Sequence, residues 1–186
     1  DWDKPWEAGV SWVSVWISWR GGPWGMWVHY TEENLDRLPD LLRAADVVVT
    51  WNGKRYDIPA LEHFTGKLPI KHHCDLFAEL LKVTGLYVSL ERCARPTLHR
   101  GKSGHGDAAP DMHQRQAWGK LSTYCGQDVA LTRDVFLFAL EHGFVWIVEK
   151  GKDERFPVPL SLRPGGQPVK VRRERTVWDK AARAGI

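Results

Sequence analysis

The sequence predicts an α/β fold in which antiparallel strands come first and parallel strands follow. Three stretches carry this prediction. Residues 10–30 alternate between two sets of side chains around a glycine–proline turn, which predicts a hairpin of strands 10–19 and 24–30. Residues 46–51 contain an apolar, β-branched run, which predicts a strand buried on both faces and paired in parallel. Residues 121–140 repeat apolar side chains at helical spacing, which predicts one long helix.

The remaining elements follow from cap, turn and breaker residues. Thr31 suits the N-cap of a helix that reaches Ala45, and Pro39 should kink or restart that helix. A short helix is expected after Asp57, with Pro59 in its first turn, where the missing N–H is harmless. Further along we expect a strand at 70–74, helices at 76–83 and 90–94, a loop at 96–110, and a hairpin of strands 144–148 and 156–160.

Length and charge predict one domain followed by a basic tail. The chain has 186 residues and 43% hydrophobic content, which suffices for one core at residues 1–162. Residues 147–186 hold ten Lys or Arg against five Asp or Glu, whereas residues 1–146 hold 16 against 18. We therefore interpret residues 163–186 as a linker and basic tail, which contacts nucleic acid or a larger acidic protein partner, or is simply solvated.

Composition also bears on location and on the tryptophans. No apolar run has the roughly 20 residues of a membrane span, and no signal-peptide pattern opens the chain. Three cysteines without paired spacing fit a reducing compartment, so we expect a cytoplasmic protein.

Seven of the eleven tryptophans lie within the first 27 residues. We expect them to form core, with stacking on bases as the alternative.

Asp128 is an unusual residue for its helix. It lies on the apolar stripe of the long helix, where a carboxylate faces the protein. A buried carboxylate must be paired or bind a metal, because burying it alone is costly. Tyr124 lies one turn earlier, so its hydroxyl reaches the same site. The alternative for Asp128 is an internal cap or an ion pair with arginine.

Asp57 follows the predicted buried strand at its carboxyl end, where ligand sites gather in α/β sheets. Asn52 and Gly53 form a turn signal directly after that strand. Taken alone, Asp57 reads as a helix N-cap, a position that aspartate suits. The pair of motifs is more specific than either one.

Together these residues resemble two motifs of the DEDD-type 3′–5′ exonucleases, the DnaQ-like branch of the ribonuclease-H-like fold. The first is Asn-x-x-x-Tyr-Asp at residues 52–57, and the second is Tyr-x-x-x-Asp at residues 124–128. The tyrosine four residues before Asp128 resembles the tyrosine subclass, since the histidine subclass would place histidine at Thr123. The resemblance covers about residues 9–160 and implies a mixed sheet flanked by helices, with the C-terminal hairpin beyond it.

The resemblance implies a phosphodiesterase that uses two Mg²⁺ or Mn²⁺ ions and acts at the 3′ ends of single-stranded DNA or RNA. It implies that Asp57 and Asp128 are metal ligands and that Tyr124 orients the attacking water. It also implies a cytoplasmic protein of bacterial or phage type. Asp75 is expected to be structural. Candidate contacts to the nucleic acid are the polar and basic residues Asn52, Lys54, Arg55, Arg100, Lys102, Lys170, Arg172 and Arg173.

The first motif of that family, an Asp-x-Glu on the opening strand, is missing from this sequence. Three explanations stand, in order: a fragment, a domain that has lost catalysis, or replacement by Asp1, Asp3 or Glu7. The function predicted is therefore an exonuclease-type domain that is truncated or inactive as given. The alternative is a non-catalytic nucleic-acid-binding or assembly module built on the same fold.

Overall fold

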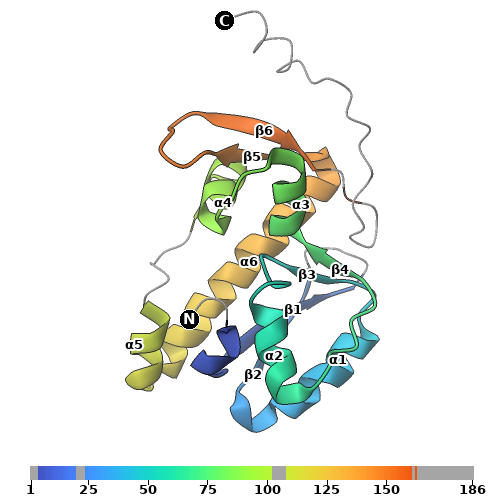
Figure 1. Cartoon of the computed structure of the whole chain (residues 1–186), viewed down its shortest axis with the longest axis vertical. Helices are drawn as coiled ribbons and strands as arrows, with labels where there is room; N and C mark the ends of the chain where they lie inside the picture. The colour runs from blue at the N-terminus through green and yellow to red at the C-terminus, as the bar shows by residue number, and fades with distance from the viewer. Residues whose placement is uncertain (1–3, 20–23, 102–107, 161, 163–186) are drawn as a thin grey trace, which may run out of the picture.

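The computed structural model describes residues 4–19, 24–101, 108–160 and 162, and it shows a mixed α/β structure (Figure 1). The long helix α6 (Trp118–His142) crosses the molecule. At one end of α6 lie the hairpin of β5 (Phe144–Val148) and β6 (Arg155–Pro159), together with α3 (Leu76–Thr84) and α4 (Leu90–Leu98). This α/β architecture confirms the fold class that the sequence predicts.

The predicted N-terminal hairpin is confirmed. A 3₁₀ turn, η1 (Pro5–Ala8), precedes β1 (Val13–Ser18), which pairs antiparallel with β2 (Gly25–Tyr30). Val13 lies opposite Tyr30 and Ser18 lies opposite Gly25. A side chain at Gly25 would clash with the carbonyl oxygen of Ile17, so the tight end of the ladder requires glycine.

Pro39 restarts the next helix, as predicted. The segment begins as a 3₁₀ helix, η2 (Glu32–Arg37), and continues as α1 (Leu38–Ala44), with Pro39 in the first turn of α1. Proline lacks an N–H, and the first turn of a helix has no intrahelical partner for one. At the start of the segment the backbone N–H of Thr31 donates to Asn34 Oδ1 at 2.7 Å.

The apolar strand is β3 (Val48–Thr50), and it pairs in parallel with β4 (His73–Asp75), as predicted. Alternate residues of this segment serve two separate cores. Val47 and Val49 pack against one hydrophobic cluster, whereas Val48 packs against the other. Helix α2 (Asp57–Thr65) follows β3 after a turn at residues 51–56, and α3 follows β4 directly, so both junctions lie at the carboxyl ends of the strands.

The two cores lie on either side of this central pair. The larger one combines α3, α4, α6, β5 and β6, with Leu76, Leu80, Val135 and Ile147 nearly inaccessible to solvent. The smaller one combines β2, η2, α1 and α2 around Leu35, Leu38, Leu42 and Leu61. Helix α6 packs against β1, β3 and β5, so it ties the two halves together.

Several sequence-based boundaries are wrong. Helix α4 continues through Pro96 to Leu98, and α5 (Ala108–Gln114) begins inside the loop expected at 96–110. Strand β4 begins at His73, three residues after the expected start. Helix α6 begins at Trp118, three residues before the predicted start. Tertiary contact explains α4, because Thr97 Oγ1 donates to the carbonyl of Trp146 at 2.8 Å and accepts from its N–H at 3.0 Å. These bonds hold the last turn of α4 on β5.

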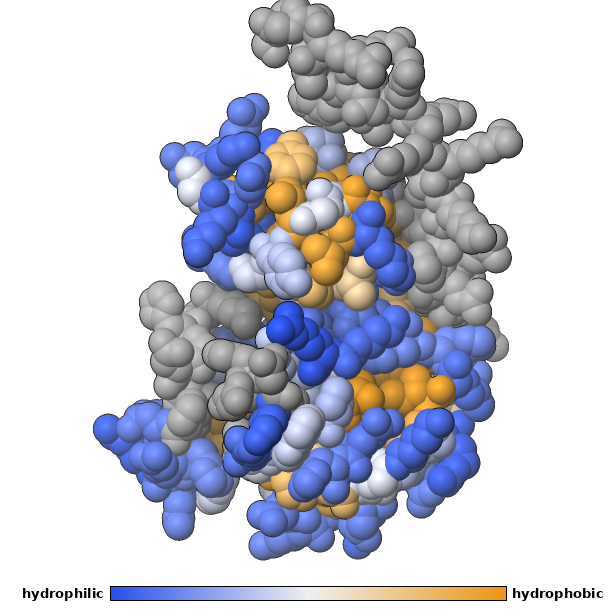
Figure 2. All heavy atoms as spheres, in the orientation of Figure 1, coloured by the Kyte–Doolittle hydropathy of each residue, from blue (hydrophilic) through white to orange (hydrophobic). Residues whose placement is uncertain are grey.

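The strands of the described residues form three two-stranded sheets, β1–β2, β3–β4 and β5–β6. The core expected from the first seven tryptophans does not form: Trp6, Trp12 and Trp16 are only half-buried, and Trp2 lies outside the described residues. Trp19 is 65% exposed and Trp24 is 85% exposed, while Trp27 lies at 38%. In the view of Figure 2, apolar side chains reach the surface over α3, and hydrophilic side chains cover most of the opposite end of the molecule.

Candidate functional site

The negative charges of Asp57 and Asp128 interact in the folded chain, although 71 residues separate them in the sequence. Asp57 is the first residue of α2, and Asp128 lies half-buried on α6. The pKa of Asp57 is raised, first by desolvation and then by the negative charges of Asp75 and Asp128, while a hydrogen bond from its own backbone acts in the opposite direction. The Asp57 side chain is still exposed, so its carboxylate is accessible to water although other negative charges act on it.

The pKa of Cys125 is affected by the same two carboxylates, Asp128 and Asp57. It lies three residues before Asp128 on α6, half-buried. Burial raises the pKa of the Cys125 thiol to about 11, and Asp128 and then Asp57 add to that rise. Tyr124 is also half-buried and lies one turn before Asp128. Sequence reasoning missed Cys125, although its helical spacing from Asp128 was a usable signal.

Asp75 anchors the turn that leads to Asp57. Its side chain is 1% exposed and accepts three backbone N–H groups: Asn52 at 2.9 Å, Lys54 at 2.9 Å and Ala78 at 3.2 Å. The Ala78 bond makes Asp75 the N-cap of α3. One carboxylate therefore joins the β4–α3 junction to the β3–α2 turn, which accords with the structural role expected for Asp75.

The β3–α2 turn has little freedom of its own. Asn52 has a φ of 61°, a left-handed conformation that asparagine tolerates better than most residues. A Cβ added at Gly53 would lie 2.6 Å from both Cβ and Oγ1 of Thr50, so this position needs glycine. Thr50 is itself held, since its Oγ1 lies 2.8 Å from Nε2 of His73. The turn thus sets where α2 begins and where Asp57 stands.

The predicted basic contacts divide into two groups. Lys54 and Arg55 are exposed on the turn before Asp57, and the Arg55 guanidinium lies 5.4 Å from the centre of the Tyr56 ring. Arg100 lies at the end of α4 and forms an ion pair with Asp134 of α6, which also accepts from Arg133 Nε at 2.6 Å. The predicted contacts Lys102, Lys170, Arg172 and Arg173 lie outside the described residues.

The donor set fits a divalent cation only in part. Two carboxylates that repel one another offer hard oxygen ligands, which suit Mg²⁺ or Mn²⁺. Asp75 is already committed to backbone donors. The part of the chain that the structure describes brings together no group of three or more His, Cys, Asp or Glu suited to a metal ion. The described residues by themselves therefore do not supply the ligands of a two-ion centre.

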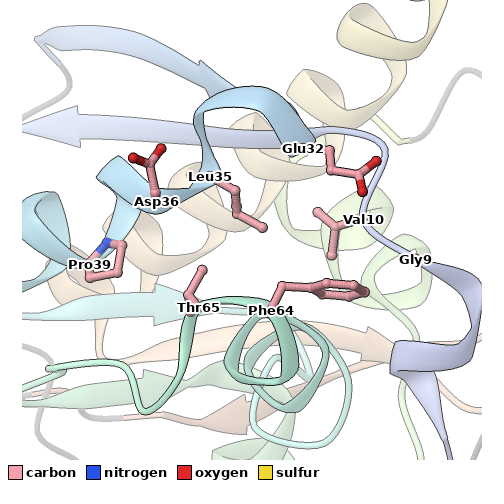
Figure 3. A pocket seen from close by; sticks show the side chains of 8 residues that line it. All are labelled: Gly9, Val10, Glu32, Leu35, Asp36, Pro39, Phe64 and Thr65. Atoms are coloured by element: carbon pink, nitrogen blue, oxygen red, sulfur yellow. The ribbon is translucent and has the colours of Figure 1, made fainter.

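A separate cavity of about 400 Å³ lies on another part of the molecule (Figure 3). Val10, Leu35 and Phe64 give it an apolar lining, and Glu32 and Asp36 add carboxylates from η2. Gly9, Pro39 and Thr65 complete the lining. None of the candidate site residues lines this cavity, so it is distinct from the acidic pair.

Comparison with known proteins decides the family. Residues 28–136, more than half of the chain, match a family model of the RNase H superfamily. This chain belongs to the RNase H superfamily. The matched region runs from β2 into α6 and includes both Asp57 and Asp128. Searches of curated proteins and of solved structures give no significant match.

Membership of the RNase H superfamily supports a nuclease-type domain that contacts nucleic acid, and it accords with the mixed α/β architecture. RNase H superfamily nucleases generally use divalent metals, which agrees with the chemistry of the acidic pair. In the described ranges no helix is long and apolar enough to cross a membrane.

Proposed function

We propose that this chain is a metal-dependent 3′–5′ exonuclease-type domain that acts at the 3′ ends of single-stranded DNA or RNA. The observation that carries the proposal is that α6, which bears Asp128, packs on β3, whose carboxyl end leads through a turn to Asp57, so that the charge of Asp128 acts on Asp57. Membership of the RNase H superfamily supports the nuclease class. The tyrosine that precedes Asp128 by one turn supports the finer assignment to the DEDD type, tyrosine subclass.

In this proposal each residue has one role. Asp57 and Asp128 would hold Mg²⁺ or Mn²⁺, because carboxylate oxygens suit hard cations. Tyr124 would orient the water that attacks the terminal phosphodiester. A metal held there would supply a lower pKa for that water and positive charge for the leaving oxygen. Asn52, Lys54 and Arg55, on the turn before Asp57, contact the nucleic acid, and their position beside the acidic pair supports this role.

The incomplete donor set favours a second candidate, a nucleic-acid-binding module without hydrolysis. Two ions need more carboxylates than Asp57 and Asp128 supply, and the described residues add no third ligand to that pair. We therefore expect the chain as given to be inactive or very weak as a nuclease. The same chain carrying an Asp-x-Glu strand beside β1 should trim 3′ ends.

The experiment uses a single-stranded oligonucleotide labelled at its 5′ end, with Mn²⁺ or Mg²⁺. The chain that carries the added Asp-x-Glu strand should shorten it stepwise from the 3′ end, and Asp128→Asn in that chain should abolish the trimming. Trimming that survives Asp128→Asn would contradict the proposal. Binding without trimming by the chain with the added strand would favour the non-catalytic module.

A further inference from the structure

The cavity shown in Figure 3 has two walls that come from different parts of the chain. Helix η2 carries Glu32, Leu35 and Asp36 along one wall. Phe64 and Thr65, at the end of α2, form the opposite wall. We call the space between them the η2–α2 cavity. Its volume of about 400 Å³ lies in the range of sites that bind small molecules.

Apolar side chains form the interior of the η2–α2 cavity. Leu35 is only 4% exposed, and it belongs with Val10 to the smaller core. The Phe64 ring remains 45% exposed. Its centre lies 5.0 Å from that of the His63 ring, to which it is edge-on, and His63 in turn stacks on Trp6 at 6.1 Å. A ring that other rings hold in place loses little conformational entropy when a ligand packs on it, so the cavity suits an apolar body.

The polar side chains of the cavity wall that lack a partner are both carboxylates. The Thr65 hydroxyl already donates to the carbonyl of Leu61 at 2.9 Å. Glu32 and Asp36, in contrast, are exposed, and among the described residues neither takes part in an ion pair. No Lys, Arg or His of the described chain lines the cavity. A ligand with a positive charge would therefore complement this wall.

The surface around the η2–α2 cavity carries the same negative sign. Residues 31–46, which include η2 and α1, hold five Asp or Glu against two Arg. One of these two, Arg43, is already paired with Asp40. Such an excess of negative charge attracts cations and repels anions over about 10 Å at 0.1 M salt. The charge therefore disfavours nucleic acid, or any other anion, as the ligand of this cavity.

A bare metal ion does not fit the cavity wall either. Mg²⁺ and Ca²⁺ take about six or more oxygen ligands, whereas this wall offers two carboxylates beside aliphatic and aromatic groups.

We propose that the η2–α2 cavity binds a small organic cation, an amine or guanidinium carried on an apolar ring or chain. The apolar part packs between Leu35 and Phe64, and the charged group lies at the rim near Glu32 and Asp36. Helix α2 has Asp57 at its start and the cavity at its end, so this site is separate from the acidic pair. The inference goes beyond the nuclease function and does not depend on it.

The test uses tryptamine as the probe and compares it with indole-3-propanoate, an anion that has the same ring. Binding of each to the full chain is followed by ¹H–¹⁵N NMR titration in EDTA at low salt, which gives both the affinity and the residues affected. Tryptamine should bind with a Kd of about 1 mM or lower, as expected for a ligand of this size, and should shift the amide signals of Val10, Leu35 and Thr65. Indole-3-propanoate should bind about 5-fold more weakly or less.

Substitutions in the wall should weaken tryptamine binding in two ways. Glu32→Gln and Asp36→Asn should each reduce the affinity by about 2- to 5-fold, because each removes one exposed charge. Phe64→Ala should reduce the affinity for both probes by about 2- to 10-fold, because it removes the aromatic wall.

Glu33→Gln is the matched control, because Glu33 is an exposed neighbour on η2 that does not line the cavity. It should leave the affinity for tryptamine unchanged. Equal losses from Glu32→Gln and Glu33→Gln, equal affinities for the two probes, or shifts that map to Asp57 and Asp128 would overturn the proposal. So would the absence of tryptamine binding, even if a lysine-containing peptide bound, because the cavity would then dock a protein. Failure of this test leaves the Asp128-dependent trimming unaffected, so the two proposals fail separately.

Discussion

At the scale of single residues, the candidate site depends on Asp75, whose carboxylate is bound to backbone N–H groups of the neighbouring turns. Asp75 is almost inaccessible to solvent and accepts three backbone N–H groups from two segments. Hydrogen bonds to a charged acceptor are the stronger kind, and a buried donor left without a partner costs free energy. The same charge raises the pKa of Asp57. Asp75 thus stabilises the turn and adds to the negative field at its end.

Asp75→Asn should lower the free energy of unfolding by about 2–4 kcal/mol, because the amide group would face backbone donors. Urea denaturation measures this loss. The control is Asp40→Asn, since Asp40 is 80% exposed and forms an ion pair with Arg43 on the surface. The control should change stability by less than about 1 kcal/mol. Equal effects of the two substitutions would contradict the anchoring role of Asp75.

The raised pKa of Asp57 gives a stability prediction with a definite sign. The folded protein holds the proton of Asp57 more tightly than the unfolded chain, whose pKa is near 3.8. That contribution is fully present below the unfolded pKa and is lost as the pH rises through the folded pKa. At neutral pH the Asp57 carboxylate therefore destabilises the fold.

Asp57→Asn should raise the melting temperature at pH 7 without divalent cations by about 1–3 °C, a small gain because solvent screens the repulsion at this exposed side chain. Asparagine has nearly the same shape as aspartate, so the geometry of the first residue of α2 is kept. Circular dichroism at pH 7 and at pH 3 measures the difference, which should vanish at the lower pH. A lower melting temperature at pH 7 would show that Asp57 has a stabilising partner.

At the scale of elements, the turn between the half-buried strand β3 and helix α2 sets the position at which α2 begins. Thr50, Gly53 and Asp75 lock it from three directions: a side chain pair with His73, a close backbone approach, and the carboxylate bonds. Packing against a hydrophobic cluster on each face holds the half-buried strand β3 itself. The catalytic candidate Asp57 is therefore positioned by packing several residues away from it.

Gly53→Ala should destabilise the fold by about 1–3 kcal/mol, because the new methyl would overlap the Cβ of Thr50, which cannot move without the strand. It should also weaken any cation binding at Asp57. Gly119→Ala is the matched control, since an added Cβ on α6 meets nothing within 4 Å there. That control should be neutral or stabilising by up to about 1 kcal/mol. Thermal unfolding of both variants decides the matter.

At the scale of the whole molecule, charge is distributed unevenly along the chain. We propose that residues 163–186 act as a basic tail to a domain at residues 1–162, as the composition predicts. The tail contributes Lys170, Arg172, Arg173 and Arg175. Contacts to phosphate release counterions, so such a tail adds affinity that depends on salt and carries no sequence preference.

A chain that ends at Leu162 should bind single-stranded oligonucleotides more weakly than the full chain, with a shallower dependence of affinity on salt. Anisotropy titrations at several salt concentrations measure both quantities. Equal affinity and equal salt slopes would show that the tail serves as a linker or a protein-docking segment.

Local sequence determined most of the element types and indicated the candidate residues of the site. Strand alternation identified the hairpin, and the apolar run at residues 47–51 identified β3 and its parallel pairing. Asp57 was indicated by its place after that strand, and Asp128 by its place on the apolar stripe of a helix. These signals are local, because side-chain periodicity follows directly from strand and helix geometry. The resemblance to the RNase H superfamily could also be recognised from the sequence, because it rests on two short local motifs.

Tertiary structure alone decided the rest. Helix α4 passes through Pro96 because Thr97 is bonded to Trp146, a residue 49 positions away. The tryptophans of the hairpin are exposed because no element of the described chain covers them, and a sequence cannot state what lies above a strand face. The negative field that links Asp57, Asp75, Cys125 and Asp128 is likewise a property of three packed elements, since charge interactions depend on distances that only the fold sets.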